Sequence, residues 1–300
     1  MKQMKNSLLL LLTATIWGCA FVAQSVGMDY IGPFSFNAIR SIIGSIVLIP
    51  VILIFGRDKE KETKEEQKVL WTGGIICGVL MFIASNLQQI GIMGATVGKA
   101  GFITALYIVM IPVIGLFMGR KSGGKLWFCV ALSLVGLYLL CMKSNNLALN
   151  QADILLLLCA FVFSIHILVV DHYSPKVNGV KLSCIQFLVC GILSAIPMFA
   201  VEHPQLASVQ AAWLPIAYAG VMSCGVAYTL QIVGQKGLNP VIASLIMSLE
   251  SVIAAIAGWI LLGQNLSARE ISGCILMFAA IIITQLPERR RKTMQAEAAE

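Results

Sequence analysis

The segment SLIMSLESVIAAIAGWILLG, residues 244–263, is predominantly apolar and carries one acid, Glu250, near its middle. A helix of about 20 residues is about 30 Å long, which is the thickness of a bilayer core. An ionised side chain at its centre costs about 2.5–3.5 kcal/mol, so Glu250 must face a wet cavity, pair with a cation or be protonated. Small residues share its predicted helix face and suit either a cavity or close helix packing. Glu250 therefore either contacts a transported solute or proton, or makes a structural hydrogen bond.

Two other ionisable side chains lie inside apolar runs. Arg40, about two turns into the run 34–55, could pair with an acid, bind an anionic solute group or extend outward to water. His166, near the middle of the run 153–171, could relay protons, because imidazole titrates near neutral pH, or could hydrogen-bond between helices. Both are candidates for a substrate or ion pathway.

Uncharged polar side chains extend this set. Asn86 and Gln89 lie within one apolar run and suit either a polar pathway or interhelical hydrogen bonds. Trp17, in the first run, is either a packing residue or one wall of an aromatic site.

Several other chemistries lack their residues. No second His or Cys stands at ligand spacing from His166, so we expect no metal site and no cofactor. The stretch GRKSGGKL resembles a Walker phosphate loop but ends in Leu126, which has no hydroxyl for magnesium. No GxSxG, HExxH or paired-carboxylate motif occurs in a suitable context, so we expect no enzyme. The basic residues form no continuous face for nucleic acid, despite a net charge of +7.

The elements that must position these residues are membrane-spanning helices. Of the 300 residues, 58% are hydrophobic and 12% charged, and the mean hydropathy is +0.88. Soluble domains average about 25% charged residues, so a bilayer is the natural solvent. Since unpaired backbone groups are not tolerated in hydrocarbon, each apolar run is predicted to be a helix. The ten predicted spans are 7–26, 34–55, 69–90, 96–118, 125–142, 153–171, 181–201, 211–232, 239–261 and 267–286.

The two halves of the chain repeat. A shift of 143 positions gives nine identities between Leu87 and Gly115, among them Leu106 with Leu249. Each half carries five predicted spans, so the second half must enter the membrane from the opposite side, as in transporters with inverted repeats. We expect an all-α fold with repeats at 1–145 and 146–288 and a polar tail at 289–300. Tyr107 is the repeat partner of Glu250 and could contact a substrate there or simply pack in the core.

The distribution of basic residues predicts the orientation. With the N-terminus in the cytoplasm, 17 of the 21 Lys and Arg residues fall in or beside inner segments and 3 in or beside outer ones. This bias follows the positive-inside rule, so both termini are predicted to face the cytoplasm, with the protein in the cell inner membrane. Glycine pairs such as Gly74 with Gly78 could serve internal packing or a homodimer.

Four stretches carry a family resemblance: IWGCAFV, GPFSFNAIR, GKAGFITALYIVMIPVIGLFMGR and SLESVIAAIAGWILLGQNLS. They resemble the EamA family of the drug/metabolite transporter superfamily, in two copies over about 7–286. The usual ninth-span pattern has a proline where this chain has Ser251 and a second acid where it has Gln264. The missing proline predicts a helix without a kink at 251.

The resemblance implies transport of small metabolites such as amino acids, nucleobases or drug-like compounds. We expect a secondary transporter that exports by alternating access around a central cavity in the lipid bilayer, with Glu250 as its best charged contact. Coupling to protons and facilitated diffusion are both compatible with the sequence. Uptake by the same architecture is the first alternative, and a passive channel or a lipid-modifying membrane enzyme are further ones.

Overall fold

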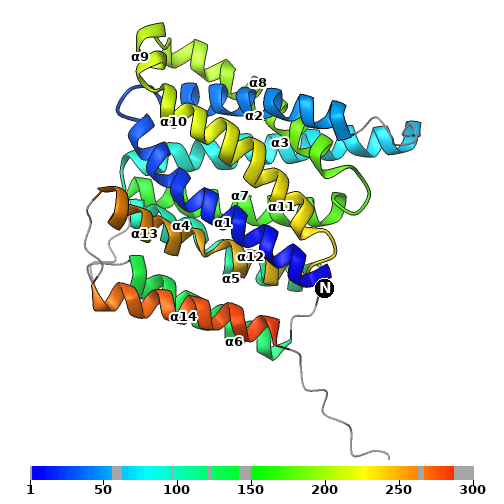
Figure 1. Cartoon of the computed structure of the whole chain (residues 1–300), viewed down its shortest axis with the longest axis vertical. Helices are drawn as coiled ribbons and strands as arrows, with labels where there is room; N and C mark the ends of the chain where they lie inside the picture. Colours follow the sequence, from blue (N-terminus) through cyan, green and yellow to red (C-terminus); the bar gives the residue numbers. More distant parts are fainter. Residues whose placement is uncertain are drawn as a thin grey trace, which may run out of the picture.

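The computed structural model describes residues 2–55, 63–95, 97–120, 123–141, 150–262 and 267–286, and every regular element in these ranges is a helix (Figure 1). The predicted tail 289–300 and Gln264 lie outside the described residues. The helices of the first half are α1 (Lys2–Gly27), α2 (Pro33–Phe55), α3 (Lys64–Met93), α4 (Val97–Ala105), α5 (Tyr107–Phe117) and α6 (Gly124–Cys141). Those of the second half are α7 (Gln151–Tyr173), α8 (Gly179–Pro197), η1 (Met198–Glu202), α9 (Leu206–Ala211), α10 (Trp213–Ala217), η2 (Tyr218–Ala227), α11 (Tyr228–Gln235), α12 (Pro240–Met247), α13 (Glu250–Leu262) and α14 (Ala268–Gln285).

Eight helical stretches of the described chain are long and apolar enough to cross a bilayer. They are Gln3–Gly27, Pro33–Ile54, Lys64–Met93, Ala100–Phe117, Gln151–Tyr173, Gly179–Glu202, Trp213–Gln235 and Pro240–Ala257. Helix α6 contains a shorter apolar stretch, Gly124–Leu139, and α14 lies where the last span is predicted. The structure thus supports a multi-pass, all-helical membrane protein, and the count of ten spans stays a prediction.

Polar side chains begin several helices. Asn239 Oδ1 accepts a hydrogen bond from Val241 N at 2.8 Å, and Pro240 follows as the first helical residue of α12. Asn178 caps α8 in the same way, through the amides of Val180 and Lys181. Such caps pair amides that have no partner within the helix, which fixes where each helix starts.

Two of the predicted spans are interrupted near their middles. Leu106 separates α4 from α5, and residues 248–249 separate α12 from α13. The backbone amide of Leu106 donates to the carbonyl oxygen of Ile103 at 3.2 Å, and that of Leu249 donates to the carbonyl oxygen of Ile246 at 3.2 Å. Both hydrogen bonds span three residues instead of four, which tightens the helical turn. The second interruption precedes Ser251, which lies inside α13, so the absence of a kink at 251 stays a prediction.

The physical reason for the second interruption is found in its serines. The hydroxyl groups of Ser244 and Ser248 donate to the carbonyl groups of Val241 and Leu245, at 2.9 and 2.8 Å. Serine hydroxyls that bond to the preceding turn bend helices, so a proline is not needed to disturb this one.

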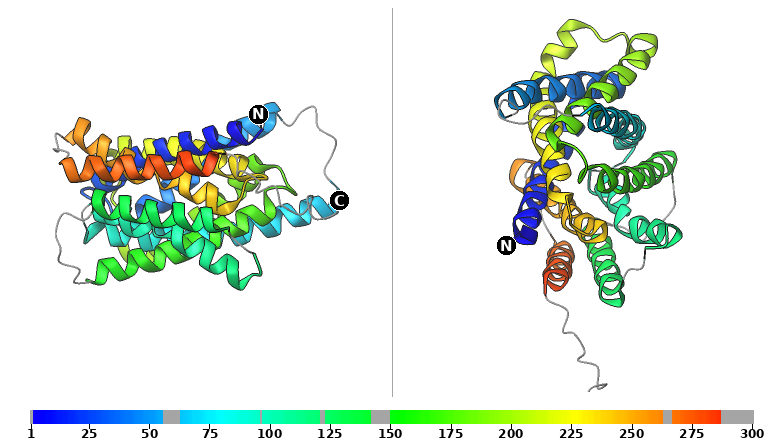
Figure 2. Two further views of the ribbon diagram at one scale, coloured as in Figure 1. Left: turned by 90° about the horizontal axis from the view of Figure 1, so that it is seen from below. Right: turned by 90° about the vertical axis from the view of Figure 1, so that its right-hand side faces the viewer.

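The main helix contacts join the first half of the chain to the second. Helix α2 packs on α8, α3 on α7 and α8, α6 on α14, and α1 on α11, η2 and α13. Figures 1 and 2 show α2 and α8 at one edge of the bundle and the pair α6 and α14 at the opposite edge. An added Cβ on Gly74 or Gly78 would lie 2.4–2.8 Å from atoms of α8, so these glycines serve packing within the chain.

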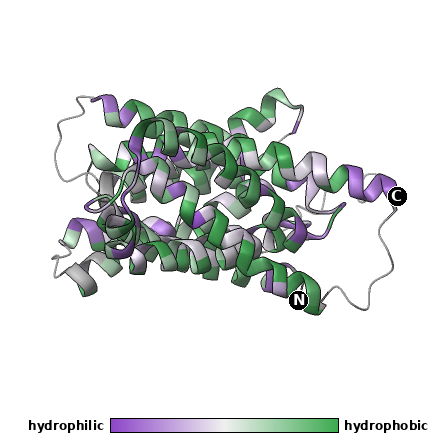
Figure 3. Cartoon of the chain, turned by 90° about the horizontal axis from the view of Figure 1, so that it is seen from above, coloured by the Kyte–Doolittle hydropathy of each residue, from purple (hydrophilic) through white to green (hydrophobic). Residues whose placement is uncertain are grey.

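Large apolar side chains cover much of the exposed surface, while polar ones are buried among the helices. Phe117, Leu206 and Val201 are 90%, 72% and 69% exposed, whereas Arg40 and Glu250 are each 5% exposed. Figure 3 shows that hydrophobic colouring predominates along the helices. A surface of this kind is stable in lipid rather than in water, and it leaves the buried polar groups as the place to look for function.

Candidate functional site

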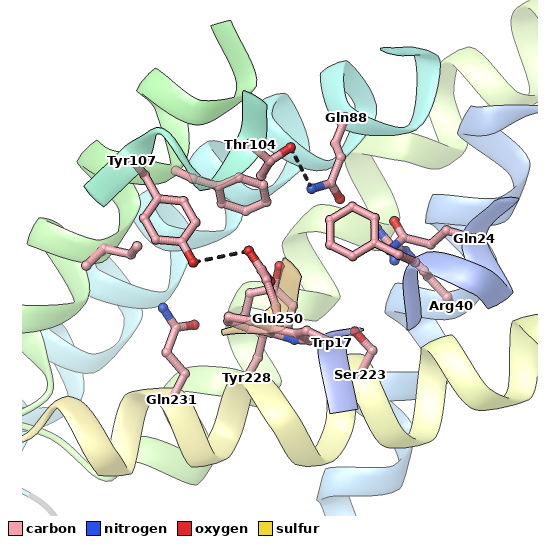
Figure 4. Close-up of a pocket in the computed structure, with 13 residues that line it drawn as sticks. Trp17, Gln24, Arg40, Gln88, Thr104, Tyr107, Ser223, Tyr228, Gln231 and Glu250 are labelled. Carbon is pink, nitrogen blue, oxygen red and sulfur yellow. Dashed lines mark hydrogen bonds between the residues drawn. The ribbon is translucent and has the colours of Figure 1, made fainter. Parts of the chain in front are cut away.

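A cavity lies between the two halves of the chain and is lined by residues of both. Four of the residues singled out from the sequence line it: Trp17, Arg40, Tyr107 and Glu250 (Figure 4). Its other polar or hydroxyl-bearing lining residues are Gln24, Gln88, Thr104, Ser223, Tyr228 and Gln231, and its remaining walls are Phe21, Phe163 and Ile167. The cavity therefore combines a few polar groups with aromatic and aliphatic walls, as small-molecule sites do.

Tyr107 and Glu250 are bonded to each other inside this cavity. The Tyr107 hydroxyl donates to Glu250 Oε1 at 3.1 Å, and both residues are nearly buried. Each is the first residue of the helix that follows an interruption, Tyr107 in α5 and Glu250 in α13. The repeat partners predicted from the 143-residue shift thus meet in space.

Close packing holds Glu250 in place. Gly18 of α1 faces α13, and a Cβ there would lie 2.7 Å from the Glu250 carbonyl oxygen and 2.6 Å from Ile253 Cβ. On the other side, Ser251 Oγ donates to the Gly101 carbonyl of α4 at 3.3 Å. The backbone at Glu250 is therefore held between α1 and α4.

Arg40 lines the cavity from α2 with its charge unpaired. Its guanidinium lies 5.5 Å from the centroid of the Phe36 ring, a cation–π contact within its own helix. Its Nε is buried with no hydrogen-bond partner. Among the described residues, no carboxylate lies within ion-pair distance of Arg40.

Tyr228 is the centre of an aromatic cluster that sequence reasoning missed. Its ring centroid lies 4.5 Å from that of Trp17 and 5.1 Å from that of Phe187. The His166 ring meets it edge-on, with centroids 6.4 Å apart. These contacts come from four separate helical elements, so no local pattern in the sequence could have identified Tyr228.

Glutamines from both halves also reach the cavity. Gln88 Nε2 donates to Thr104 Oγ1 at 3.5 Å, and Gln231 Oε1 is buried with no partner. Gln88 and Gln231 coincide in the 143-residue shift, so the repeat itself carried the signal that could have found Gln231. Gln24 Oε1 is likewise buried without a partner.

The remaining predicted residues lie outside the cavity lining. His166 Nε2 lies 3.1 Å from Gln186 Oε1, between α7 and α8. Asn86 joins α3 to α2 and α8, because its amide accepts from Asn37 Nδ2 and donates to Ser194 Oγ, both at 3.0 Å. Gln89 donates to the Gln24 carbonyl at 3.2 Å. Their hydrogen bonds suit the interhelical role, and a pathway role for them stays a prediction.

No group of three His, Cys, Asp or Glu side chains in the described ranges is placed to hold a metal ion. The cavity offers instead one carboxylate, one guanidinium, amides, hydroxyls and aromatic faces. Such a set can bind and release a polar organic solute by hydrogen bonds, charge and stacking.

Comparison with known proteins gives a consistent result. The sequence model of the EamA-like transporter family matches residues 4–142 and again 150–286. An uncharacterized transporter of Archaeoglobus fulgidus is 29% identical over 95% of this chain and 87% of its own length. The uncharacterized transporters YwfM and YoaV of Bacillus subtilis are each 23% identical, over 99% and 92% of this chain and 99% and 95% of their own.

A solved crystal structure has the same fold. It superposes with a TM-score of 0.78 over 96% of this chain and 99% of its own, at 18% identity. The family match covers nearly the whole chain in two segments, and the helices found are those of a multi-pass membrane protein. This chain is a membrane transporter that belongs to the EamA-like transporter family of the drug/metabolite transporter superfamily.

Proposed function

We propose that the protein is a secondary transporter that exports small amphipathic metabolites by alternating access around the cavity described above. The observation that carries this proposal is the bond between Tyr107 and Glu250 inside a cavity that both halves line. Ionisable residues buried in a membrane domain are costly and mark substrate or ion pathways. Interrupted helices at the interface between repeats are where such transporters place their sites.

We further propose ten spans arranged as two inverted five-helix repeats, residues 1–145 and 146–288. The helix contacts support this arrangement. The contact of α3 with α7 in one half corresponds to the contact of α11 with α1 in the other. In the same way, the contact of α13 with α1 corresponds to the contacts of α4 and α5 with α7. Each such pair of contacts is exchanged by swapping the two halves, as a two-fold axis in the membrane plane requires.

The proposed location is the cell inner membrane with both termini in the cytoplasm, and it rests on the distribution of Lys and Arg. Contacts between chain segments fit the alternation of sides that this topology needs. Asn6 Nδ2 donates to the Lys236 carbonyl, and Arg120 pairs with Asp171, all in segments proposed to be inner. Glu202 bonds to the amides of Phe34 and Ser35, all in segments proposed to be outer.

In the proposed mechanism, one half rocks against the other about the cavity. A solute or proton that takes the Glu250 carboxylate competes with the Tyr107 hydroxyl and so loosens a bond between the halves. Trp17 and Tyr228 stack on the apolar part of the solute. Proton coupling through Glu250 and assembly into a homodimer are carried as hypotheses.

The test is transport in proteoliposomes of wild type and of Glu250→Gln, after a resistance screen of an overexpressing strain against toxic amino acids and base analogues has named a solute. We expect the variant to lose at least tenfold in rate or affinity. Glu270→Gln is the matched control, because Glu270 is also a buried carboxylate (8% exposed) and glutamine preserves its capping box with Ser267. Normal rate, pH dependence and affinity in Glu250→Gln would make the residue structural, and counterflow with radiolabelled solute reports the direction.

A further inference from the structure

We infer that Arg40 forms an anion-binding subsite across the cavity from Glu250, so that the transported solute is a zwitterion. Its anionic group would bind Arg40, its cationic group Glu250, and its apolar part the aromatic cluster around Tyr228. The inference rests on the proposed function, in which this cavity is the transport site.

The first step is the state of Arg40. An arginine always carries its charge, and burying that charge without a counter-ion is expensive. Arg40 is 5% exposed, its guanidinium lies over the Phe36 ring, and its Nε has no acceptor. Trp17 Nε1, which also lines the cavity, is a second buried donor with no acceptor. These two buried donors without acceptors belong to residues of one cavity, where they are suited to donate hydrogen bonds to the oxygens of an anionic ligand.

The second step is the state of Glu250. Its carboxylate receives one hydrogen bond, from Tyr107, and has no cationic partner among the described residues. Gln231 Oε1 is a second acceptor at the cavity that lacks a donor. Figure 4 draws Gln231 and Tyr107 on one side of Glu250 and Arg40 with Gln24 on the other. A solute ammonium group at Glu250 would satisfy both acceptors.

The third step joins the two. Arg40 and Glu250 line the same cavity and do not pair with each other. An organic cation would leave Arg40 unpaired, and an organic anion would leave Glu250 unpaired. A solute that carries both charges satisfies both residues and adds no net charge to the membrane interior, where charge is costly.

The experiment uses purified full-length protein in nanodiscs and three probes that share one ring: phenylalanine, phenethylamine and 3-phenylpropionate. A second trio on a smaller chain comprises leucine, isoamylamine and 4-methylvalerate. Calorimetry should give the zwitterion at least tenfold tighter binding than its amine or acid analogue in one trio or both. Arg40→Gln should bind the zwitterion no more tightly than the amine, and its affinity for the amine should be unchanged. Glu250→Gln should instead bind the zwitterion no more tightly than the acid analogue.

Arg269→Gln is the matched control, because Arg269 also lies over an aromatic ring, Tyr138 at 5.3 Å, but on α14 away from the cavity. Arg40→Lys, which keeps the charge, should retain a preference for the zwitterion if Arg40→Gln fails to fold. Equal binding of amine and zwitterion by wild type in both trios, or unchanged preference in Arg40→Gln, overturns the inference. Transport that persists without charge preference leaves the proposed function standing, whereas Glu250→Gln with unaltered transport overturns the proposed function itself.

Discussion

Tyr107 and Glu250 stand 143 residues apart in sequence, and the hydroxyl of one donates to the carboxylate of the other at 3.1 Å. The residues before them, Leu106 and Leu249, coincide in the internal repeat and lie at the two helix interruptions. This single hydrogen bond therefore connects equivalent points of the two halves of the chain. Any solute or proton that takes the carboxylate must also change how the halves are joined.

Replacing Tyr107 by phenylalanine removes this hydroxyl and leaves the ring. We expect the buried Glu250 carboxylate to lose its one hydrogen bond from protein, at a cost of about 1–3 kcal/mol. Transport in proteoliposomes should slow several-fold, and its dependence on pH should shift. Tyr218→Phe is the control, because the Tyr218 hydroxyl also joins two helices, donating to the Ile16 carbonyl at 3.1 Å, but lies outside the cavity lining. Equal effects of the two variants would contradict a special role for Tyr107.

Gly18 and Gly101 make a second pair of variants with opposite expectations. An alanine at Gly18 places its Cβ 2.6–2.8 Å from Ile253 side-chain atoms and the Glu250 carbonyl oxygen, so α1 and α13 must separate. We expect a loss of about 1–3 kcal/mol in stability together with weaker solute binding. At Gly101 the closest atom would be Ser251 Oγ at 3.6 Å, an ordinary contact. Gly101→Ala should therefore be neutral or slightly stabilising, because alanine favours a helix by about 0.5–1 kcal/mol over glycine.

Thermal unfolding in detergent measures both glycine variants, and solute binding is measured on the same samples. A Gly18→Ala protein as stable as wild type, with unchanged binding, would show that the approach of α1 to α13 does not set the position of Glu250.

Asn86 tests the distinction between a polar pathway and an interhelical contact. Its side chain takes part in hydrogen bonds to Phe82, Ser194 and Asn37, at 2.7, 3.0 and 3.0 Å. Interhelical hydrogen bonds in membranes are worth about 0.6 kcal/mol each, so Asn86→Leu should lower stability by about 1–2 kcal/mol. Solute affinity should be unchanged, since Asn86 does not line the cavity. A specific loss of affinity at normal stability would place Asn86 on the pathway after all.

Hydropathy and the internal repeat account for what could be predicted. Apolar runs located the helices because a bilayer demands about 20 apolar residues per span. The repeat identified Tyr107 as the partner of Glu250, and it also pairs Gln88 with Gln231, both of which line the cavity. Polarity alone ranked Asn86 and Gln89 beside them, although their hydrogen bonds go to neighbouring helices. Polarity within a span does not tell which way a side chain points.

The interruptions and the aromatic cluster depend on contacts between distant parts of the chain. The turn at 248–249 involves serines whose hydroxyls can bond either within the helix or to a neighbour, and sequence alone does not choose. Tyr228 lines the cavity because Trp17 and Phe187 orient its ring, and these come from α1 and α8. Such a convergence of separate helices leaves no local pattern.

The proposed topology predicts which loops meet an impermeant thiol reagent in intact cells. In variants with one added cysteine, Tyr30→Cys and Gln205→Cys, both at exposed positions, should react with the reagent from outside the cell. Lys176→Cys and Lys236→Cys, also at exposed positions, should react with the reagent only after the cells are opened. The parent protein sets the background from its native cysteines. Labelling of all four positions from the same side would exclude an inverted arrangement of the two halves.

Glu202 provides the last prediction, because it caps a helix from the other half of the chain. Its carboxylate accepts from Phe34 N at 2.9 Å, Ser35 N at 2.7 Å and Ser35 Oγ at 2.6 Å, at the start of α2. A carboxylate at a helix N-terminus adds about 0.3–1 kcal/mol, and hydrogen bonds to a charged group about 1.5–3 kcal/mol. Glu202→Ala should lower the unfolding temperature by several degrees.

Glu202→Gln, which keeps an acceptor but loses the charge, should lie between wild type and Glu202→Ala. Because Glu202 does not line the cavity, solute affinity should stay at the wild-type value in both variants. A capped α2 start also fixes the helix that carries Arg40, so slower transport at unchanged affinity is the expected functional effect. Full stability in Glu202→Ala would mean that water replaces the carboxylate without cost, and that this contact does not hold the two halves together.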